Sequence, residues 1–196
     1  LKNGTDFLCV LGTTAETPTL TKEEKEKVKR TIIDRVNGRI PILLGVGSNS
    51  TQAVVDSVKN DDMTGVDALL VVVPYYNKPS QEGIYQHYKA VAEATELPIV
   101  LYNVPGRTGC SIPVSVVERL ATHPNIAGIK EASGDMGYAM KLAHCSRPAS
   151  GSEHVISHYW ECHKVIAGIW PEYHGKKVGV ARFVDTFMRA KIYQAS

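Results

Sequence analysis

Apolar residues in this sequence gather in short runs that do not alternate with polar residues. The clearest runs before residue 135 cover residues 7–11, 42–44, 68–73, 99–101 and 126–129. A continuous apolar run of this length is typical of a parallel strand that is buried on both faces. The pattern therefore predicts a buried parallel sheet.

Helical patterns follow these runs along the chain. Thr21 and Glu24 stand at the spacing of a capping box, and apolar residues then recur on one helix face as far as Val36. The same apolar spacing returns after Ser80 and again after Pro113. Strands that alternate with helices indicate the α/β class of fold.

The residues that directly follow the runs set the spacing of the βα units. They are Gly12, Gly45, Pro74, Tyr102 and Lys130, separated by 33, 29, 28 and 28 residues. A steady period of about 30 residues is typical of a (β/α)8 TIM barrel. A doubly wound open sheet gives a similar period, so the period alone leaves both folds open. In either fold, function lies at the carboxyl ends of the strands.

Composition and charge narrow the class of protein. The 196 residues are 43% hydrophobic and 21% charged, as in a globular protein, and the net charge of +2 indicates no nucleic-acid partner. No apolar run approaches the ~18 residues that a membrane helix needs, so no membrane partner is expected. The cysteines at 9, 110, 145 and 162 follow no metal or disulfide spacing, which indicates a reduced, cytoplasmic protein.

Candidate chemistry gathers at the predicted strand ends. Tyrosines, threonines and one lysine meet there, whereas histidines and paired carboxylates do not, apart from Glu131. We therefore expect no metal site, no cofactor and no paired-carboxylate chemistry. Lys130 ends an apolar run, and a lysine in such a place can attack a ketone to form a Schiff base. The alternative is a lysine that merely extends to solvent from a strand end.

A second cationic side chain follows the fourth predicted strand. Arg107 stands five residues past Tyr102, after a turn formed by Pro105 and Gly106. A guanidinium binds a carboxylate through two parallel hydrogen bonds, so Arg107 is a candidate for holding an acidic substrate. An ordinary exposed loop arginine is the alternative interpretation.

Long motifs carry a resemblance to a known family. They read GTTAETPTLT from Gly12, PYYNKPSQEGIYQHYKAVAEAT from Pro74, LPIVLYNVPGRTG from Leu97 and IAGIKEASG from Ile126. Together they resemble the dihydrodipicolinate synthase family of pyruvate-dependent class I aldolases, which also includes N-acetylneuraminate lyase. The resemblance runs in unbroken order from about residue 3 to about residue 134, and it implies a (β/α)8 barrel.

The resemblance also implies roles for the residues at the strand ends. Lys130 would form the Schiff base with pyruvate, and Tyr102 would donate and accept protons at that centre. Thr14 would link Tyr102 to Tyr76 in a proton relay, with Tyr76 reaching into the site of a neighbouring subunit. Thr13 and Thr14 would hold the pyruvate carboxylate.

The implied reaction is that of a lyase in lysine biosynthesis by the diaminopimelate route. Pyruvate would condense with L-aspartate 4-semialdehyde, whose carboxylate Arg107 would bind, to give 4-hydroxy-tetrahydrodipicolinate. The implied assembly is a homodimer or homotetramer. A related 2-keto-acid aldolase, such as N-acetylneuraminate lyase, and a non-catalytic family member are the alternatives. Arg107 favours the first reaction, because a sugar-acid site would need hydroxyl-binding groups instead.

The sequence departs from the family pattern at both ends. The strand and helix that precede the position of Leu1 in the family are absent. Further on, the residues from His158 to Trp160 stand where the family has a Gly-Asp pair. We therefore expect a partial barrel over residues 1–151, with its first unit and last strands missing or unrecognisable. A segment of uncertain assignment would follow over residues 152–196.

The resemblance bears on regulation by lysine as well. Family members that lysine inhibits carry a histidine and a glutamate in the effector pocket, where this sequence has Lys25 and Ala53. Asn49 and Tyr75 match the pocket pattern. Because Lys25 repels a cationic effector and Ala53 offers no countercharge, weak or absent inhibition by lysine is expected.

Overall fold

The structure is a computed structural model, and it describes residues 5–144 of the chain. Its strands are β1 (Leu8–Val10), β2 (Ile42–Val46), β3 (Ala68–Val72), β4 (Ile99–Asn103) and β5 (Ile126–Glu131). Its helices are α1 (Lys22–Val36), α2 (Thr51–Asn60), α3 (Gln81–Ala92), α4 (Pro105–Thr108), α5 (Val114–Ala121) and α6 (Met136–Leu142). The chain divides into two compact units, the first ending at Gly128 and the second beginning at Ile129. The segment expected over residues 152–196 lies outside the described residues.

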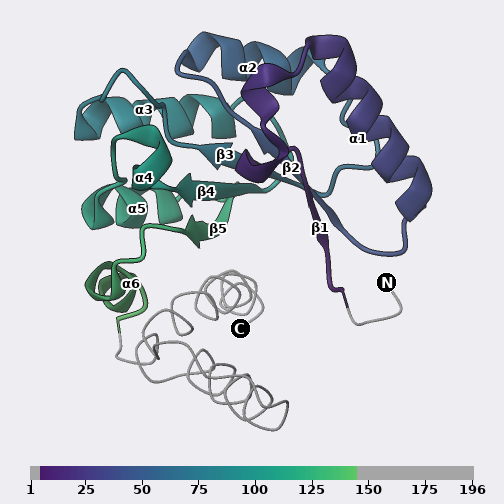
Figure 1. The fold of residues 1–196 in the computed structure, drawn as a ribbon. Helices are drawn as coiled ribbons and strands as arrows, with labels where there is room; N and C mark the ends of the chain where they lie inside the picture. The colour runs from purple at the N-terminus through teal and green to yellow at the C-terminus, as the bar shows by residue number, and fades with distance from the viewer. Residues whose placement is uncertain (1–4, 145–196) are drawn as a thin grey trace, which may run out of the picture. The chain divides into compact units, whose positions relative to one another are not determined.

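The strands form a sheet in the order β1-β2-β3-β4-β5 (Figure 1). Strands β1 to β4 pair in parallel, and their register aligns Val10 with Leu44, Leu44 with Leu69, and Val71 with Leu101. A doubly wound sheet reverses its strand order at a switch point, whereas here each strand lies beside its neighbour in sequence. The predicted parallel α/β fold is confirmed, and the strand order favours the barrel.

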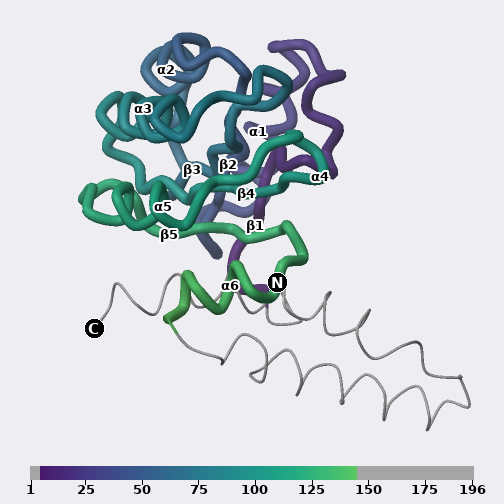
Figure 2. Tube along the Cα trace, turned by 90° about the vertical axis from the view of Figure 1, so that its left-hand side faces the viewer, coloured from purple at the N-terminus to yellow at the C-terminus, as the bar shows by residue number. Residues whose placement is uncertain are grey.

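One face of strands β1 to β4 forms the core of the first unit. The register places Val10, Leu44, Leu69, Val71 and Leu101 on this face, and all of them are buried. Helices α2 and α3 lie along the strands in both views of the chain (Figures 1 and 2). Successive side chains of a strand point to opposite faces, so the alternate positions are left to line the other face.

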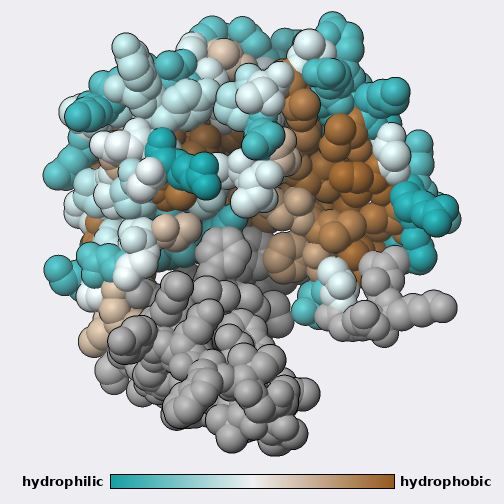
Figure 3. Space-filling model, viewed as in Figure 1, coloured by the Kyte–Doolittle hydropathy of each residue, from teal (hydrophilic) through white to brown (hydrophobic). Residues whose placement is uncertain are grey.

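Apolar surface remains on helix α1. Val28 and Ile32 of this helix are half-exposed. Figure 3 shows apolar side chains gathered on the side of the molecule where α1 and β1 lie. The described residues of the chain therefore leave part of the apolar face of α1 uncovered.

Side-chain caps fix where the principal helices begin. The predicted capping box is present at α1, where the Thr21 amide donates to Glu24 Oε2 (2.8 Å) and the Glu24 amide donates to Thr21 Oγ1 (3.2 Å). Ser50 and Ser80 accept in the same way from the first turns of α2 and α3. Each cap satisfies an amide that the helix itself leaves without a partner.

Glycine permits a close approach between the ends of β1 and β2. A Cβ atom on Gly45 would lie 2.2 Å from the carbonyl oxygen of Leu11. A Cβ atom on Gly47 would lie 2.3 Å from Cγ1 of Val72. Gly45 therefore lets the turn that follows β1 pack against the end of β2, and Gly47 lets the residues after β2 pack against β3.

Among residues 5–144, no helix is long and apolar enough to cross a membrane.

Candidate functional site

The centre of the candidate site is a contact between the ends of β1 and β4. Tyr102 lies in β4 and is 6% exposed. Thr13 begins a 3₁₀ turn just after β1, and its hydroxyl donates to the Tyr102 hydroxyl at 3.2 Å. The two residues stand 89 positions apart in sequence. The fold therefore assembles this pair of hydroxyls from distant segments.

This contact also reports the shape of the sheet. Strands β1 and β4 are separated by β2 and β3. In a flat sheet with strands about 4.8 Å apart, β1 and β4 would lie roughly 14 Å apart. Thr13 and Tyr102 meet in spite of this separation because the sheet curls toward the face that carries Tyr102. Such curvature is what a barrel requires.

The two threonines of the turn after β1 differ in their surroundings. The hydroxyl that donates to Tyr102 belongs to Thr13. Thr13 is half-buried and Thr14 is exposed, because consecutive residues of a 3₁₀ turn point in different directions. The part of Thr14 in a relay toward Tyr76 stays a prediction.

Arg107 lies in α4, one short turn of helix after β4. The Thr108 hydroxyl lies within hydrogen-bond distance of the carbonyl oxygens of Val104 (3.2 Å) and Cys110 (2.8 Å), and Gly109 ends the turn with φ of 72°. Arg107 itself is exposed, and it forms no ion pair with any carboxylate among residues 5–144. Its guanidinium is thus available to an acidic ligand.

Tyr76 extends from the β3–α3 loop. Tyr76 is 85% exposed, and its backbone adopts φ of 71°, which few non-glycine residues do. The Tyr76 amide donates to the carbonyl oxygen of Thr108 at 3.3 Å, so this loop adjoins the Arg107 segment. A large side chain held in solvent by an unusual backbone conformation is a candidate for contact with another molecule.

Asn103 supports the candidate site, although the sequence pattern alone assigns it no role. It follows Tyr102 at the end of β4 and is 0% exposed. Its side-chain oxygen accepts from the Ile112 amide at 3.0 Å and from the Ser111 hydroxyl at 3.3 Å. The signal available in the sequence was a polar residue directly after an apolar run.

Lys130 belongs to the second unit. It is the fifth residue of β5 and is half-buried. Glu131 beside it is buried, and one of its oxygens accepts from the Ser133 amide at 2.5 Å. Burial raises the pKa of the Tyr138 hydroxyl on α6, and the nearby Glu131 carboxylate raises it further. The position at the carboxyl end of a strand is the one predicted for Lys130.

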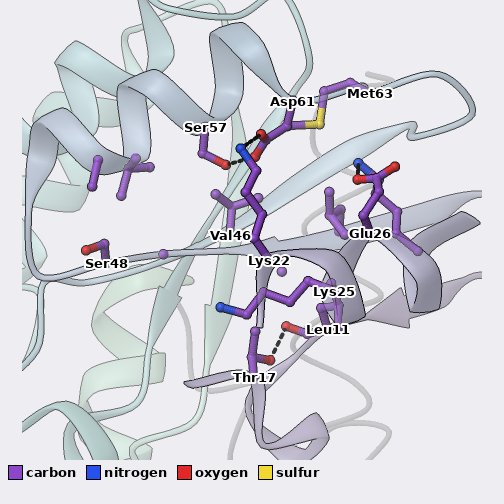
Figure 4. A pocket seen from close by; sticks show the side chains of 16 residues that line it. Leu11, Thr17, Lys22, Lys25, Glu26, Val46, Ser48, Ser57, Asp61 and Met63 are labelled. Atoms are coloured by element: carbon purple, nitrogen blue, oxygen red, sulfur yellow. Dashed lines mark hydrogen bonds and ion pairs between the residues drawn. The ribbon is translucent and has the colours of Figure 1, made fainter. Parts of the chain in front are cut away.

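A cavity of about 150 Å³ lies between α1, the end of β2 and the start of α2 (Figure 4). Lys25 and Ala53, which replace the expected effector-binding residues, both line it. Lys22 pairs with Asp61 at 2.9 Å beside them. No group of three or more His, Cys, Asp or Glu residues in the described part of the chain is placed to hold a metal ion.

The curved parallel sheet, with polar side chains at its carboxyl ends, defines the chain as a βα-barrel protein. The sequence model of the "Dihydrodipicolinate synthetase family" matches residues 1–158. The chain belongs to this family. The identification made from the motifs is confirmed, and the solved structures that the chain matches confirm the barrel fold.

Relatives with assigned activities are close in sequence. The chain is 76% identical over 137 residues to "4-hydroxy-tetrahydrodipicolinate synthase" of Phocaeicola vulgatus, covering 69% of this chain and 46% of the relative. It is 61% identical over 137 residues to the protein of the same name from Parabacteroides distasonis, with the same coverage of 69% and 46%. The chain therefore spans about half the length of the curated relatives it matches.

One of the solved structures that the chain matches contains bound pyruvate. Dihydrodipicolinate synthase from Acinetobacter baumannii, determined in complex with pyruvate, is 49% identical with a TM-score of 0.70. The match covers 74% of this chain and 50% of that one.

Proposed function

We propose that the chain forms part of a 4-hydroxy-tetrahydrodipicolinate synthase, a lyase that condenses pyruvate with L-aspartate 4-semialdehyde. The observation that carries the proposal is the Thr13–Tyr102 hydrogen bond at the curled strand ends, within a chain of this family. The relatives' names support the synthase over the N-acetylneuraminate lyase alternative. The proposal places the reaction in lysine biosynthesis, in the cytoplasm.

The first steps of the proposed mechanism use Lys130. Its neutral amine adds to the keto carbon of pyruvate, and water leaves as the carbon–nitrogen double bond forms. The iminium draws electrons from the neighbouring methyl group, which loses a proton to give an enamine. Tyr102 carries protons at this centre, and its hydrogen bond from Thr13 orients the hydroxyl for that task.

The later steps use the second substrate. The enamine carbon attacks the aldehyde carbon and forms the new carbon–carbon bond, with the aldehyde oxygen taking up a proton. The amino group of the semialdehyde then closes the ring by displacing the Lys130 amine. Arg107 binds the carboxylate of the semialdehyde, and its exposure without an ion pair among the described residues supports this role.

The remaining assignments concern pyruvate and the assembly. Thr13 and Thr14 hold the pyruvate carboxylate at the turn after β1. Tyr76 serves the site of a neighbouring subunit in a homodimer or homotetramer, where Thr14 links it to Tyr102. The 85% exposure of Tyr76 supports this part, because a ring that serves another subunit must project from its own.

Lysine is proposed to be a weak inhibitor of this protein, or none at all. Lys25 and Ala53 line one cavity, so the repulsive cation and the missing countercharge act at the same place. Lys22 lines the cavity as well and is paired with Asp61. A lysine effector would therefore meet the positive charge of Lys25 and would find no carboxylate at position 53 to bind its ammonium group.

The test of the proposed function is chemical trapping. Borohydride reduces a Schiff base to a stable amine, so pyruvate plus borohydride should add mass to the peptide that contains Lys130. Lys130→Ala should abolish the added mass, while Lys141→Ala, at an exposed lysine of α6, should leave it unchanged. Labelling at another lysine, or none in folded protein, would refute the mechanism.

A further inference from the structure

The segment that carries Arg107 is attached to the end of β4 through the buried side chain of Asn103. Asn103 and Ile112 are each 0% exposed, and the Asn103 side chain meets the Ile112 amide at 3.0 Å. A backbone amide can only donate, so the atom that faces it is the Asn103 oxygen. The Ser111 hydroxyl lies 3.3 Å from the same oxygen. Asn103 thus closes the loop that runs from β4 to α5.

Other hydrogen bonds of this segment lie within its own turn or join it to the β3–α3 loop. The Thr108 hydroxyl bonds to the carbonyl oxygens of Val104 and Cys110. The Thr108 carbonyl oxygen accepts from the Tyr76 amide at 3.3 Å. These bonds shape the turn and join it to the β3–α3 loop. The Asn103 bonds join the far end of the segment to β4 itself.

We propose that Asn103 is a positioning residue, which holds residues 104–112 against the end of β4 and thereby fixes where Arg107 presents its guanidinium. The inference rests on the proposed function, in which Arg107 binds the carboxylate of the semialdehyde. Tyr102 and Asn103 are adjacent in a strand, so their side chains leave on opposite faces. One strand end therefore supplies a reacting hydroxyl on one face and a loop anchor on the other.

The chain contains a matched control for this anchor. Asn125 is a half-buried asparagine that also closes a loop, since its amide group donates to the carbonyl oxygens of Ala92 (3.1 Å) and Thr95 (2.7 Å). It precedes β5, at the amino ends of the strands. Loss of Asn125 should therefore cost stability without moving Arg107.

The experiment compares Asn103→Ala, Asn103→Asp, Asn125→Ala and Arg107→Ala in the full chain. Asn103→Ala should raise the KM for the semialdehyde about tenfold, with borohydride trapping of pyruvate unchanged, because a small misplacement of a binding group is costly. Asn103→Asp keeps an oxygen facing the Ile112 amide and should restore most of the affinity. Asn125→Ala should leave the KM unchanged.

A double variant decides whether Asn103 acts through Arg107. If it does, Asn103→Ala combined with Arg107→Ala should show the same KM as Arg107→Ala alone. Losses that multiply in the double variant, or a rise in KM for Asn125→Ala equal to that for Asn103→Ala, would overturn the proposal.

Amide hydrogen exchange tests the role of Asn103 independently of the proposed reaction. Asn103→Ala should speed amide exchange across residues 104–112 by tenfold or more, on the order expected for a lost local restraint, whereas Asn125→Ala should not. Unchanged exchange in this segment would overturn the anchor. An unchanged KM in Arg107→Ala would instead refute the proposed role of Arg107, while exchange still decides the role of Asn103.

Discussion

A buried histidine makes the stability of this chain depend on pH. His87 of α3 is 2% exposed, and its Nδ1 lies 2.9 Å from the hydroxyl of Thr51 at the start of α2. Among residues 5–144, its Nε2 atom has no hydrogen-bond partner. Burial disfavours the charged imidazolium and lowers the pKa of His87 from 6.5 to about 4. Acid should therefore destabilise the folded chain, because a proton on this ring is disfavoured while the ring is buried.

The sign and size of the effect follow from the two pKa values. The unfolded chain binds the proton more tightly, so the contribution of neutral His87 is fully present above pH 6.5 and is lost as the pH falls toward 4. Each pKa unit is worth about 1.4 kcal/mol. At pH 5 the free energy of unfolding should be lower by about 2 kcal/mol than at pH 8 on account of this group alone.

The assay is urea unfolding of the chain at pH 5 and pH 8. His87→Gln cannot gain the proton, so its stability should fall less between the two pH values, by about 2 kcal/mol. His144→Gln, at an exposed histidine, should keep the wild-type dependence and serves as the control. If His87→Gln and the wild type lose the same free energy between pH 8 and pH 5, the reasoning is refuted.

The other predictions concern the site and its supporting turn. Thr13→Val should lower kcat by roughly a hundredfold because Tyr102 loses its oriented hydrogen bond, whereas Thr13→Ser should retain most activity; steady-state rates check both. Arg107→Ala should weaken use of the semialdehyde about ten- to hundredfold while pyruvate trapping survives, and equal losses in both assays would place Arg107 elsewhere. Initial rates should stay unchanged at sub-millimolar lysine, and half-inhibition in that range would contradict the interpretation of Lys25. Gly45→Ala should destabilise the chain by about 1–3 kcal/mol in urea unfolding, since its Cβ has no room beside the Leu11 carbonyl.

The strands of the sheet could be predicted from the sequence because strands buried on both faces consist of consecutive apolar residues. Every predicted apolar run became a strand, yet β2, β4 and β5 continue beyond their runs to Val46, Asn103 and Glu131. Backbone pairing continues past the uninterrupted apolar runs, through Gly45 in β2 and through polar residues in β4 and β5, and a hydropathy pattern cannot register that. Strand ends were consequently the least predictable part of the fold and the most relevant to function.

The sequence pattern predicts candidate residues for the site, whereas their contacts depend on the folded structure. The choice between Thr13 and Thr14 depends on the direction that each side chain takes in a 3₁₀ turn, and neighbouring threonines give no sign of it in sequence. The contacts of Asn103 are absent from the sequence pattern for a related reason. Its partners are amide and hydroxyl groups of residues 111 and 112, and a backbone amide looks the same in every sequence.

The order of the strands has a consequence for how the chain acquires its structure. Each described strand pairs with a strand one βα unit away, so every new pairing closes a loop of similar length and similar entropic cost. No described strand has to wait for a distant segment before it finds a neighbour. A ribosome releases the amino-terminal part first, and domains generally fold as they emerge. The sheet from β1 to β5 can therefore grow one unit at a time during synthesis, each strand docking on an edge that its predecessor has just exposed.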